Sequence, residues 1–295
     1  MIKRVFILLL FTLVAMKGMA QDPSLMDLIG DEPVSKPSFE KATFKTTRIL
    51  SGHSVETVYK GVLELRIAHR FGTLNRGAYD LFGLDQASMK FNFDYGFTPW
   101  LTVGLGRSNV EKTYDGFMKI KLLRQRTNNR VPITVVAVSG SSMNTLKWAN
   151  PERDNHFSSR MSYFHQLLIA RKFSESLSIQ VSPTVVHRNL IANDQLEKND
   201  IYSIGLGLRK KITKRTSVNF EYFFNQPGTV LKKYHNGMSL GFDLETGGHV
   251  FQLHFTNSTA MNERGFITEN SESWLKGGIH FGFNVSRVFT LKDTN

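Results

Sequence analysis

The chain contains no cysteine, so disulfide bonds cannot hold its fold and no N-terminal cysteine is available for lipidation. It also lacks an apolar run of the roughly 18 residues that a membrane-spanning helix requires. Its longest apolar run, Val5 to Ala15, follows Lys3 and Arg4 and precedes the small residues Gly18-Met19-Ala20. That pattern is typical of a secretory signal peptide over residues 1–20, which directs Sec-dependent export. Any insertion into a membrane must therefore use β-strands.

Acidic residues are outnumbered, 25 against 37 basic ones, so the formal net charge is +12, or +9 without the three basic residues of the leader. A basic balance can indicate nucleic-acid binding, but export separates this chain from nucleic acid. Lipid phosphates and anionic solutes are the expected counter-charges. The nine histidines show neither metalloprotease nor zinc-finger spacing, and we predict no metal and no cofactor.

Side chains that alternate between apolar and polar occupy twelve stretches of the sequence. Successive side chains of a β-strand point to opposite faces, so Phe91, Phe93 and Tyr95 share one face while Asn92 and Asp94 share the other. The pattern predicts strands at Gly61 to Phe71, Ser88 to Phe97, Leu101 to Arg107, Tyr114 to Leu123, Ile133 to Ser139, Arg160 to Phe173, Leu177 to Val186, Ile201 to Arg209, Ser217 to Phe224, Gly237 to Glu245, Val250 to Thr256 and Leu275 to Val288.

The connections between these stretches are mostly short and long in alternation, with the long ones at one end. This predicts an all-β fold, a closed antiparallel transmembrane β-barrel of about 12 strands in the outer membrane, with short periplasmic turns and longer outer loops. A soluble sandwich or a lipocalin-like barrel shows the same alternation with its apolar face inside. The membrane barrel is favoured because glycines recur on the polar face, as a crowded lumen would require, and because open strand edges in lipid would leave backbone groups unpaired.

The segment before the strands has a different composition. Residues 21–57 contain Pro23, Pro33 and Pro37, several acidic residues and only brief apolar patches. We predict an extended periplasmic N-terminal segment at 21–57 and the barrel domain at 58–295. A flexible lead-in, a lumen plug and a partner-binding peptide remain alternative interpretations of the segment.

Charged side chains of both signs lie on the polar face of the strands. A barrel of around eight strands is filled by side chains and one of about 16 to 18 encloses an aqueous channel, so this barrel lies between the two. The charges would either pair across the lumen or line a narrow conduit that favours anions, because the first four strands are rich in Arg and Lys. The two histidines among them could be hydrogen-bonded fillers or ligands. The candidate lumen residues are Glu64, Arg66, Lys90, Asp94, Lys119, Lys121, His254 and His280.

Basic residues also gather at the tight-turn end of the barrel. They would be ordinary solvated turn residues or a ring that holds phospholipid headgroups or an acidic periplasmic protein. The candidates for this lipid or partner rim are Arg124, Arg126, Lys172, Lys210, Lys211, Lys214 and Arg215.

Several short motifs are specific in combination: His69-Arg70-Phe71-Gly72, Phe82-Gly83-Leu84-Asp85-Gln86-Ala87, Gly106-Arg107-Ser108 with Lys112-Thr113-Tyr114-Asp115-Gly116, Tyr163-Phe164-His165-Gln166, and Pro183-Thr184 before His187-Arg188-Asn189. On these motifs the chain resembles an uncharacterised family of β-barrel proteins from Bacteroidota, a domain of unknown function. The resemblance covers Phe39 to Val288 and implies an outer-membrane location without an established activity. Motif residues at the long-loop ends of strands would build one polar cluster, either a structural clasp or a binding mouth: Arg70, Asp85, Arg107, His187 and Arg188.

The resulting functional hypothesis is a narrow pore or binding barrel for small polar or anionic solutes. The alternative is a non-conducting envelope scaffold that binds lipid or a periplasmic partner. A barrel phospholipase is a lesser alternative, since Ser162 and His165 point to opposite faces and Ser239 lies roughly 13 Å from His235 along a strand. We therefore expect no enzymatic activity, although pairs across neighbouring strands are invisible in the sequence.

Overall fold

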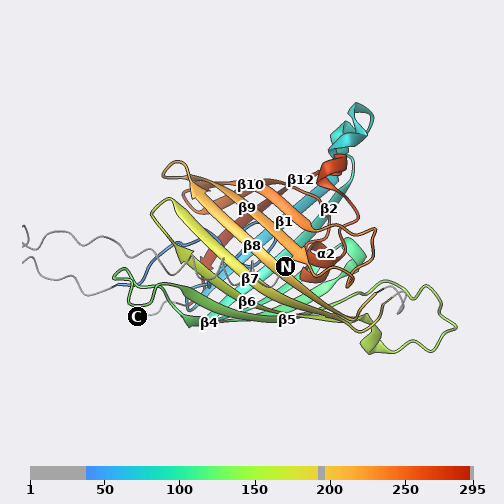
Figure 1. Cartoon of the computed structure of the whole chain (residues 1–295), viewed down its shortest axis with the longest axis horizontal. Coiled ribbons are helices and arrows are strands. Elements are labelled where there is room, and N and C mark those ends of the chain that lie inside the picture. The colour runs from blue at the N-terminus through green and yellow to red at the C-terminus, as the bar shows by residue number, and fades with distance from the viewer. Residues whose placement is uncertain (1–37, 192–196, 293–295) are drawn as a thin grey trace, which may run out of the picture. The chain divides into compact units, whose positions relative to one another are not determined.

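Twelve antiparallel strands form one closed ring in the computed structural model, which describes residues 38–191 and 197–292 (Figure 1). Each strand pairs with its sequence neighbours, and β1 closes the ring on β12. The predicted barrel and its strand number are confirmed. The strands are β1 (Val62–Thr73), β2 (Ala87–Thr98), β3 (Leu101–Ser108), β4 (Tyr114–Leu123), β5 (Thr134–Met143), β6 (Met161–Lys172), β7 (Leu177–Arg188), β8 (Asp200–Lys211), β9 (Thr216–Asn225), β10 (Gly237–Thr246), β11 (His249–Thr256) and β12 (His280–Thr290).

The apolar face of the wall points outward and the polar face inward, as the alternation predicted. On β2, Phe91 and Phe93 are 38% and 48% exposed, whereas Asn92 and Asp94 are fully buried in the lumen. A soluble barrel would have the opposite arrangement, because water would surround its outer face. The outer face of this barrel is therefore suited to lipid hydrocarbon.

The two ends of the barrel differ as expected. Short turns join β2 to β3, β6 to β7, β8 to β9 and β10 to β11 at one end, and both the start of β1 and the end of β12 lie there because Val62 pairs with Thr290. Longer connections lie at the other end, although the link from β3 to β4 is only a brief 3-10 turn, η4 (Val110–Lys112). The remaining 3-10 turns are η2 (Leu74–Arg76), η3 (Ala78–Gly83), η5 (Phe157–Arg160) and η6 (Trp274–Lys276).

Two strand boundaries were wrong by several residues, because β5 continues to Met143 beyond its predicted end at Ser139 and the last strand begins later than predicted. The last strand was predicted from Leu275, but residues 274–276 form η6 and β12 begins at His280. Gly277 ends η6 with φ 74°, in the left-handed region that glycine adopts without a steric penalty. The strand pattern therefore begins only after this glycine.

A short helix, α2 (Glu263–Thr268), lies in the long connection between β11 and β12. Asn262 caps it, because its side-chain oxygen accepts a hydrogen bond from the backbone N–H of Gly265. The helix contacts β6, β7, β9 and β10 and is buried, so it reaches across the lumen at the long-loop end. Among the described residues, no helix has the length and apolar character needed to cross a bilayer.

The chain before β1 enters the lumen from the turn end. Residues 43–58, the plug segment, are buried or half-buried apart from Lys45. An extended periplasmic location is therefore wrong for residues 43–57, which fit the alternative of a lumen plug. Residues 1–37, which include the predicted signal peptide and the remainder of the N-terminal segment, lie outside the described residues.

Candidate functional site

The tip of the plug segment is bound by side chains of the barrel wall. The carboxylate of Glu221 on β9 accepts hydrogen bonds from three consecutive backbone N–H groups, those of Leu50, Ser51 and Gly52, at 3.1, 2.8 and 2.9 Å. Consecutive N–H groups of this kind form a concave anion-binding site. The side-chain amides of Gln252 and Asn284 donate to carbonyls of the same tip at 2.7 and 2.9 Å. The tip thus satisfies its backbone groups through the wall.

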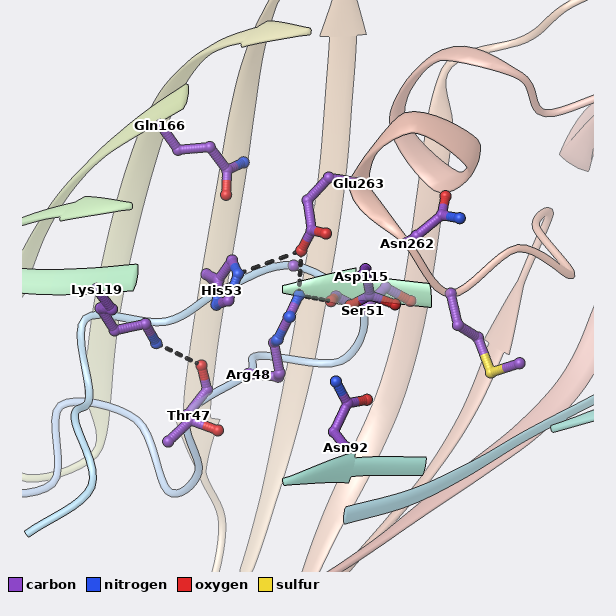
Figure 2. Close-up of polar contacts among 12 residues, drawn as sticks. Thr47, Arg48, Ser51, His53, Asn92, Asp115, Lys119, Gln166, Asn262 and Glu263 are labelled. Carbon is purple, nitrogen blue, oxygen red and sulfur yellow. Dashed lines mark hydrogen bonds and ion pairs between the residues drawn. The ribbon is translucent and has the colours of Figure 1, made fainter. Parts of the chain in front are cut away.

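Lys119 on β4 holds the plug segment from another part of the wall. Its ammonium group donates to the carbonyl oxygens of Thr47, Ser54 and Glu56 at 3.0, 3.1 and 3.0 Å. Figure 2 shows the lysine pointing at Thr47. A lysine has three N–H donors, and all three are directed at plug carbonyls.

The plug segment contacts α2 inside the lumen. Arg48 forms a buried ion pair with Glu263, and Nε2 of His53 lies 3.3 Å from a carboxylate oxygen of Glu263, as Figure 2 shows. Burial and the charges of Arg48 and Lys119 hold the pKa of His53 well below its ordinary value. Burial alone would raise the pKa of Glu263, but the charges of Arg48 and Lys90 and the hydrogen bond from Arg48 lower it below its ordinary value. Thus a carboxylate on the outer loop and a guanidinium on the plug close the lumen together.

Apolar packing completes the closure on one side of the lumen. Strands β4 to β9 bear inward apolar side chains, which the alternation of apolar and polar residues does not predict. These side chains pack with apolar residues of the plug segment and α2 in one buried cluster. These side chains form an apolar sector of the lumen, although the same strands also direct polar side chains such as Gln180 and Glu221 inward. The buried charged side chains of the wall lie mainly on β1 to β4, which form the polar sector. The inward apolar residues of the strands are Phe117, Val136, Val138, Phe164, Leu168, Ala170, Val186, Ile201 and Phe223.

The candidate lumen residues lie where the strand alternation placed them. All are buried on the inner face except Lys121, which is half-buried. Lys90 and Asp115 form an ion pair at 2.8 Å, and the hydroxyl of Thr47 bonds to Glu64 and Asp94, both at 3.2 Å. The residues in this group are Glu64, Arg66, Lys90, Asp94, Lys119, Lys121, His254 and His280.

The two lumen histidines lie on neighbouring strands and have different register partners. His254 lies opposite Gly282 on β12, whereas His280 lies opposite Thr256 and bonds to the carbonyl of Phe71 at 2.8 Å. Within residues 38–191 and 197–292, no group of three or more His, Cys, Asp or Glu residues is placed to hold a metal ion. His280 therefore has the contact expected of a hydrogen-bonded filler.

The predicted single polar cluster at the long-loop rim does not form. Arg70 and Arg188 point into the barrel, where Arg70 contacts Ser51 of the plug segment and Arg188 pairs with Glu197 at 2.9 Å. His187 faces outward and bonds to Asp200. His187 and Arg188 cannot join one cluster, because adjacent residues of a strand point to opposite sides of the wall. The other two members are also exposed, Arg107 over the ring of Tyr114 and Asp85 in the first outer loop.

The basic residues of the turn rim contact the start of the described chain. Arg124 and Arg126 lie 4.5 and 5.5 Å from the ring of Phe39, and Lys172 pairs with Glu40 at 3.3 Å. A cleft of about 490 Å³ opens beside these contacts. Two further predicted rim residues lie outside this cleft, since Lys210 bonds to Ser176 and Arg215 lines a neighbouring pocket. The basic residues that line the cleft are Lys41, Lys45, Lys172, Arg209, Lys211 and Lys214.

Two features were not visible in the sequence. The plug segment has scattered apolar residues without strand or helix periodicity, because its partner is an irregular and partly polar lumen. On the outer wall, Ser139 of β5 and His165 of β6 lie directly opposite each other and share a hydrogen bond of 3.0 Å. Only the strand register brings them together.

These features define a membrane-bound β-barrel with a filled lumen. An even-stranded, closed antiparallel barrel with an apolar outer face is the type found in bacterial outer membranes, which is where this protein is located. The family described as "Membrane bound beta barrel domain (DUF5777)" matches residues 44–289, and the chain belongs to it. The match includes almost all of the plug segment as well as the barrel.

Solved outer-membrane proteins are among the structures to which this chain is similar. A NanC porin structure has a TM-score of 0.47 and 7% identity, and covers 77% of this chain and 98% of its own. An outer membrane channel from Pseudomonas putida F1 has a TM-score of 0.44 and 12% identity, with coverages of 79% and 97%. Outer membrane phospholipase A from Escherichia coli has a TM-score of 0.40 and 12% identity, with coverages of 77% and 88%. No curated protein matches the sequence.

Proposed function

We propose that the protein is a gated outer-membrane pore for small polar solutes, closed in its resting state by the plug segment and α2. The polar sector of the lumen carries this proposal. It buries many charged groups, and within the described residues several of their atoms have no hydrogen-bond partner, including Nε of Arg66, Nε of Arg70 and one carboxylate oxygen each of Asp94 and Asp115. Burying unpaired polar atoms is unfavourable, and water would satisfy them once the plug segment left.

The polar sector also supports a weak preference for anions. Strands β1 to β4 direct five basic side chains inward against three acidic ones, Glu64, Asp94 and Asp115. Glu221 and Asp243 on β9 and β10 offset this excess, and the buried inward Arg188 on β7 and Arg209 on β8 restore it. An open conduit would therefore carry both ions with a modest bias towards the anion.

Conductance in planar bilayers tests this function. The mature chain should be silent, whereas a variant that lacks residues 21–57 should give discrete steps with a reversal potential biased towards chloride in a KCl gradient. Silence of both proteins would contradict a pore and favour a scaffold. Equal conductance of both would contradict closure by the plug segment.

The basic rim supports a second candidate function, an envelope scaffold that binds anionic lipid or an acidic periplasmic protein. The supporting observation is the cleft of about 490 Å³, whose basic side chains outnumber its acidic ones. Changing Lys210, Lys211, Lys214 and Arg215 to Gln should weaken flotation with vesicles that contain phosphatidylglycerol. The matched control changes four exposed outer-loop residues, Lys147, Arg153, Lys232 and Lys233, and should bind as the parent does; unchanged binding of the rim variant would remove this role.

A non-enzymatic role is part of the proposal. A phospholipid hydrolysis assay on the purified mature chain tests it, and release of fatty acid above that of a Ser139→Ala variant would contradict it.

A further inference from the structure

The outer wall has a concave surface in addition to the filled lumen. A groove of about 750 Å³ crosses the outer surface from β4 to β9, with Met118, Leu167, Val185 and Ile204 among its lining residues. A barrel wall is convex on the outside, so a groove needs small or interrupted positions. Ala137, Ser139 and Pro183 are such positions in this groove.

The backbone ladder is interrupted at the groove. Pairing of β6 with β7 runs from Ser162 with Arg188 to Gln166 with Thr184 and resumes at Ile169 with Val181, without a change of register. The interruption lies opposite Pro183, which has no N–H to donate. Proline within a ladder weakens the wall locally, and here it does so at membrane depth beside the groove.

A polar pair lies in this otherwise apolar groove. Ser139 and His165 are exposed on the lipid side of the wall and lie opposite each other across β5 and β6. Nδ1 of His165 lies 3.0 Å from the serine hydroxyl, and this is the ring's hydrogen bond within the described residues. When Nδ1 accepts from the hydroxyl, the neutral ring has its proton on Nε2, which is a free donor.

The depth of the pair fits the ester region of a lipid. Tyr163 lies two residues from His165 towards the long-loop end of β6 and faces outward, and Tyr202 lines the groove. Tyrosines on the lipid face mark the membrane interface. The pair therefore lies just inside the outer interface, where ester groups join the acyl chains to the headgroup.

We propose that the groove binds an ester-linked lipid of the outer leaflet, with one acyl chain along the apolar lining and its ester carbonyl accepting a hydrogen bond from Nε2 of His165. This site is separate from the lumen and does not depend on whether the barrel conducts. Ser139 is a positioning residue, because a hydroxyl that donates to Nδ1 favours the tautomer with Nε2 as the donor.

Tryptophan quenching by brominated lipid tests the site. In a background with Trp100, Trp148 and Trp274 changed to Phe, the reporter Leu167→Trp lies in the groove. The control Leu240→Trp lies on the outer face of β10, and the two leucines are 39% and 38% exposed. The full mature barrel is reconstituted in mixtures of brominated ester-linked phosphatidylcholine with its unbrominated ester or ether analogue.

We expect the groove reporter to show at least a three-fold higher relative binding constant for the ester lipid, and the control reporter to show a ratio near one. His165→Leu should abolish the preference and Ser139→Ala should reduce it, in barrels that keep the parent's heat-modifiable migration. A ratio near one at the groove, or a preference that survives His165→Leu, would overturn the proposal.

Discussion

Glu221 should be the main anchor of the plug tip, and its removal should release the plug segment. The carboxylate accepts from three backbone N–H groups in a buried site. A hydrogen bond to a charged group contributes about 1.5 to 3 kcal/mol, and water that enters after the substitution recovers part of the loss. We therefore expect Glu221→Ala to destabilise the closed state by about 3 kcal/mol, which is roughly a 100-fold increase in the ratio of open to closed barrels.

The assay is the open probability of single barrels in a planar bilayer. The matched control is Asp243→Asn on the neighbouring strand, since Asp243 is also a buried inward carboxylate but bonds to the wall residues Ser217 and Gln252. Glu221→Gln should give an intermediate effect, because one amide oxygen still accepts from the plug tip. If Glu221→Ala opened no more often than Asp243→Asn, the three hydrogen bonds would not be what holds the plug.

Three other perturbations test separate parts of the closure. Acid should open the barrel. Because the pKa of His53 is lowered in the closed state, His53 of a released plug binds a proton below about pH 6.5 while His53 of the inserted plug does not. Because the pKa of Glu263 is also lowered, the stabilisation of the closed state by Glu263 is lost only below about pH 4.3, so conductance should rise in two stages between pH 7 and pH 3 and should stay flat if neither group holds the plug. Gly207→Val should displace the plug segment, because a Cβ at this position would overlap the side chain of Ile49. Bilayer recordings of this variant should show openings, whereas the control Gly248→Val, at a turn position with open space around it, should show none. Leu168→Ala, on the buried inner face, should cost about 2 to 5 kcal/mol and lower Tm in detergent, whereas the adjacent lipid-facing Leu167→Ala should change Tm little; equal shifts would contradict the apolar sector.

The strands were predictable because lipid outside and a polar lumen inside impose a period of two on each of them. The same period placed Glu64, Lys90 and Lys119 on the inner face. It could not show that Val136, Leu168 and Ile201 also face inward, because a strand that is apolar on both faces reads as a continuous apolar run.

The plug was not predictable from periodicity. Residues 43–58 form no strand or helix, and their backbone is satisfied by side chains such as Glu221 and Lys119 that lie far away in the sequence. Contacts across the ring depend on strand register and lumen width, which local patterns do not encode. The single polar cluster failed for a local reason, since adjacent residues such as His187 and Arg188 cannot face the same side of a strand.

Thiol labelling tests the position of the plug segment most directly, because the chain has no cysteine to interfere. Ser54 is fully buried in the lumen, whereas Ser38 is exposed at the turn end. In the folded mature protein, a charged maleimide should label Ser38→Cys rapidly and Ser54→Cys at least 100-fold more slowly, with full labelling of both after unfolding. Equal rates in the folded protein would contradict a lumen closed by residues 43–58.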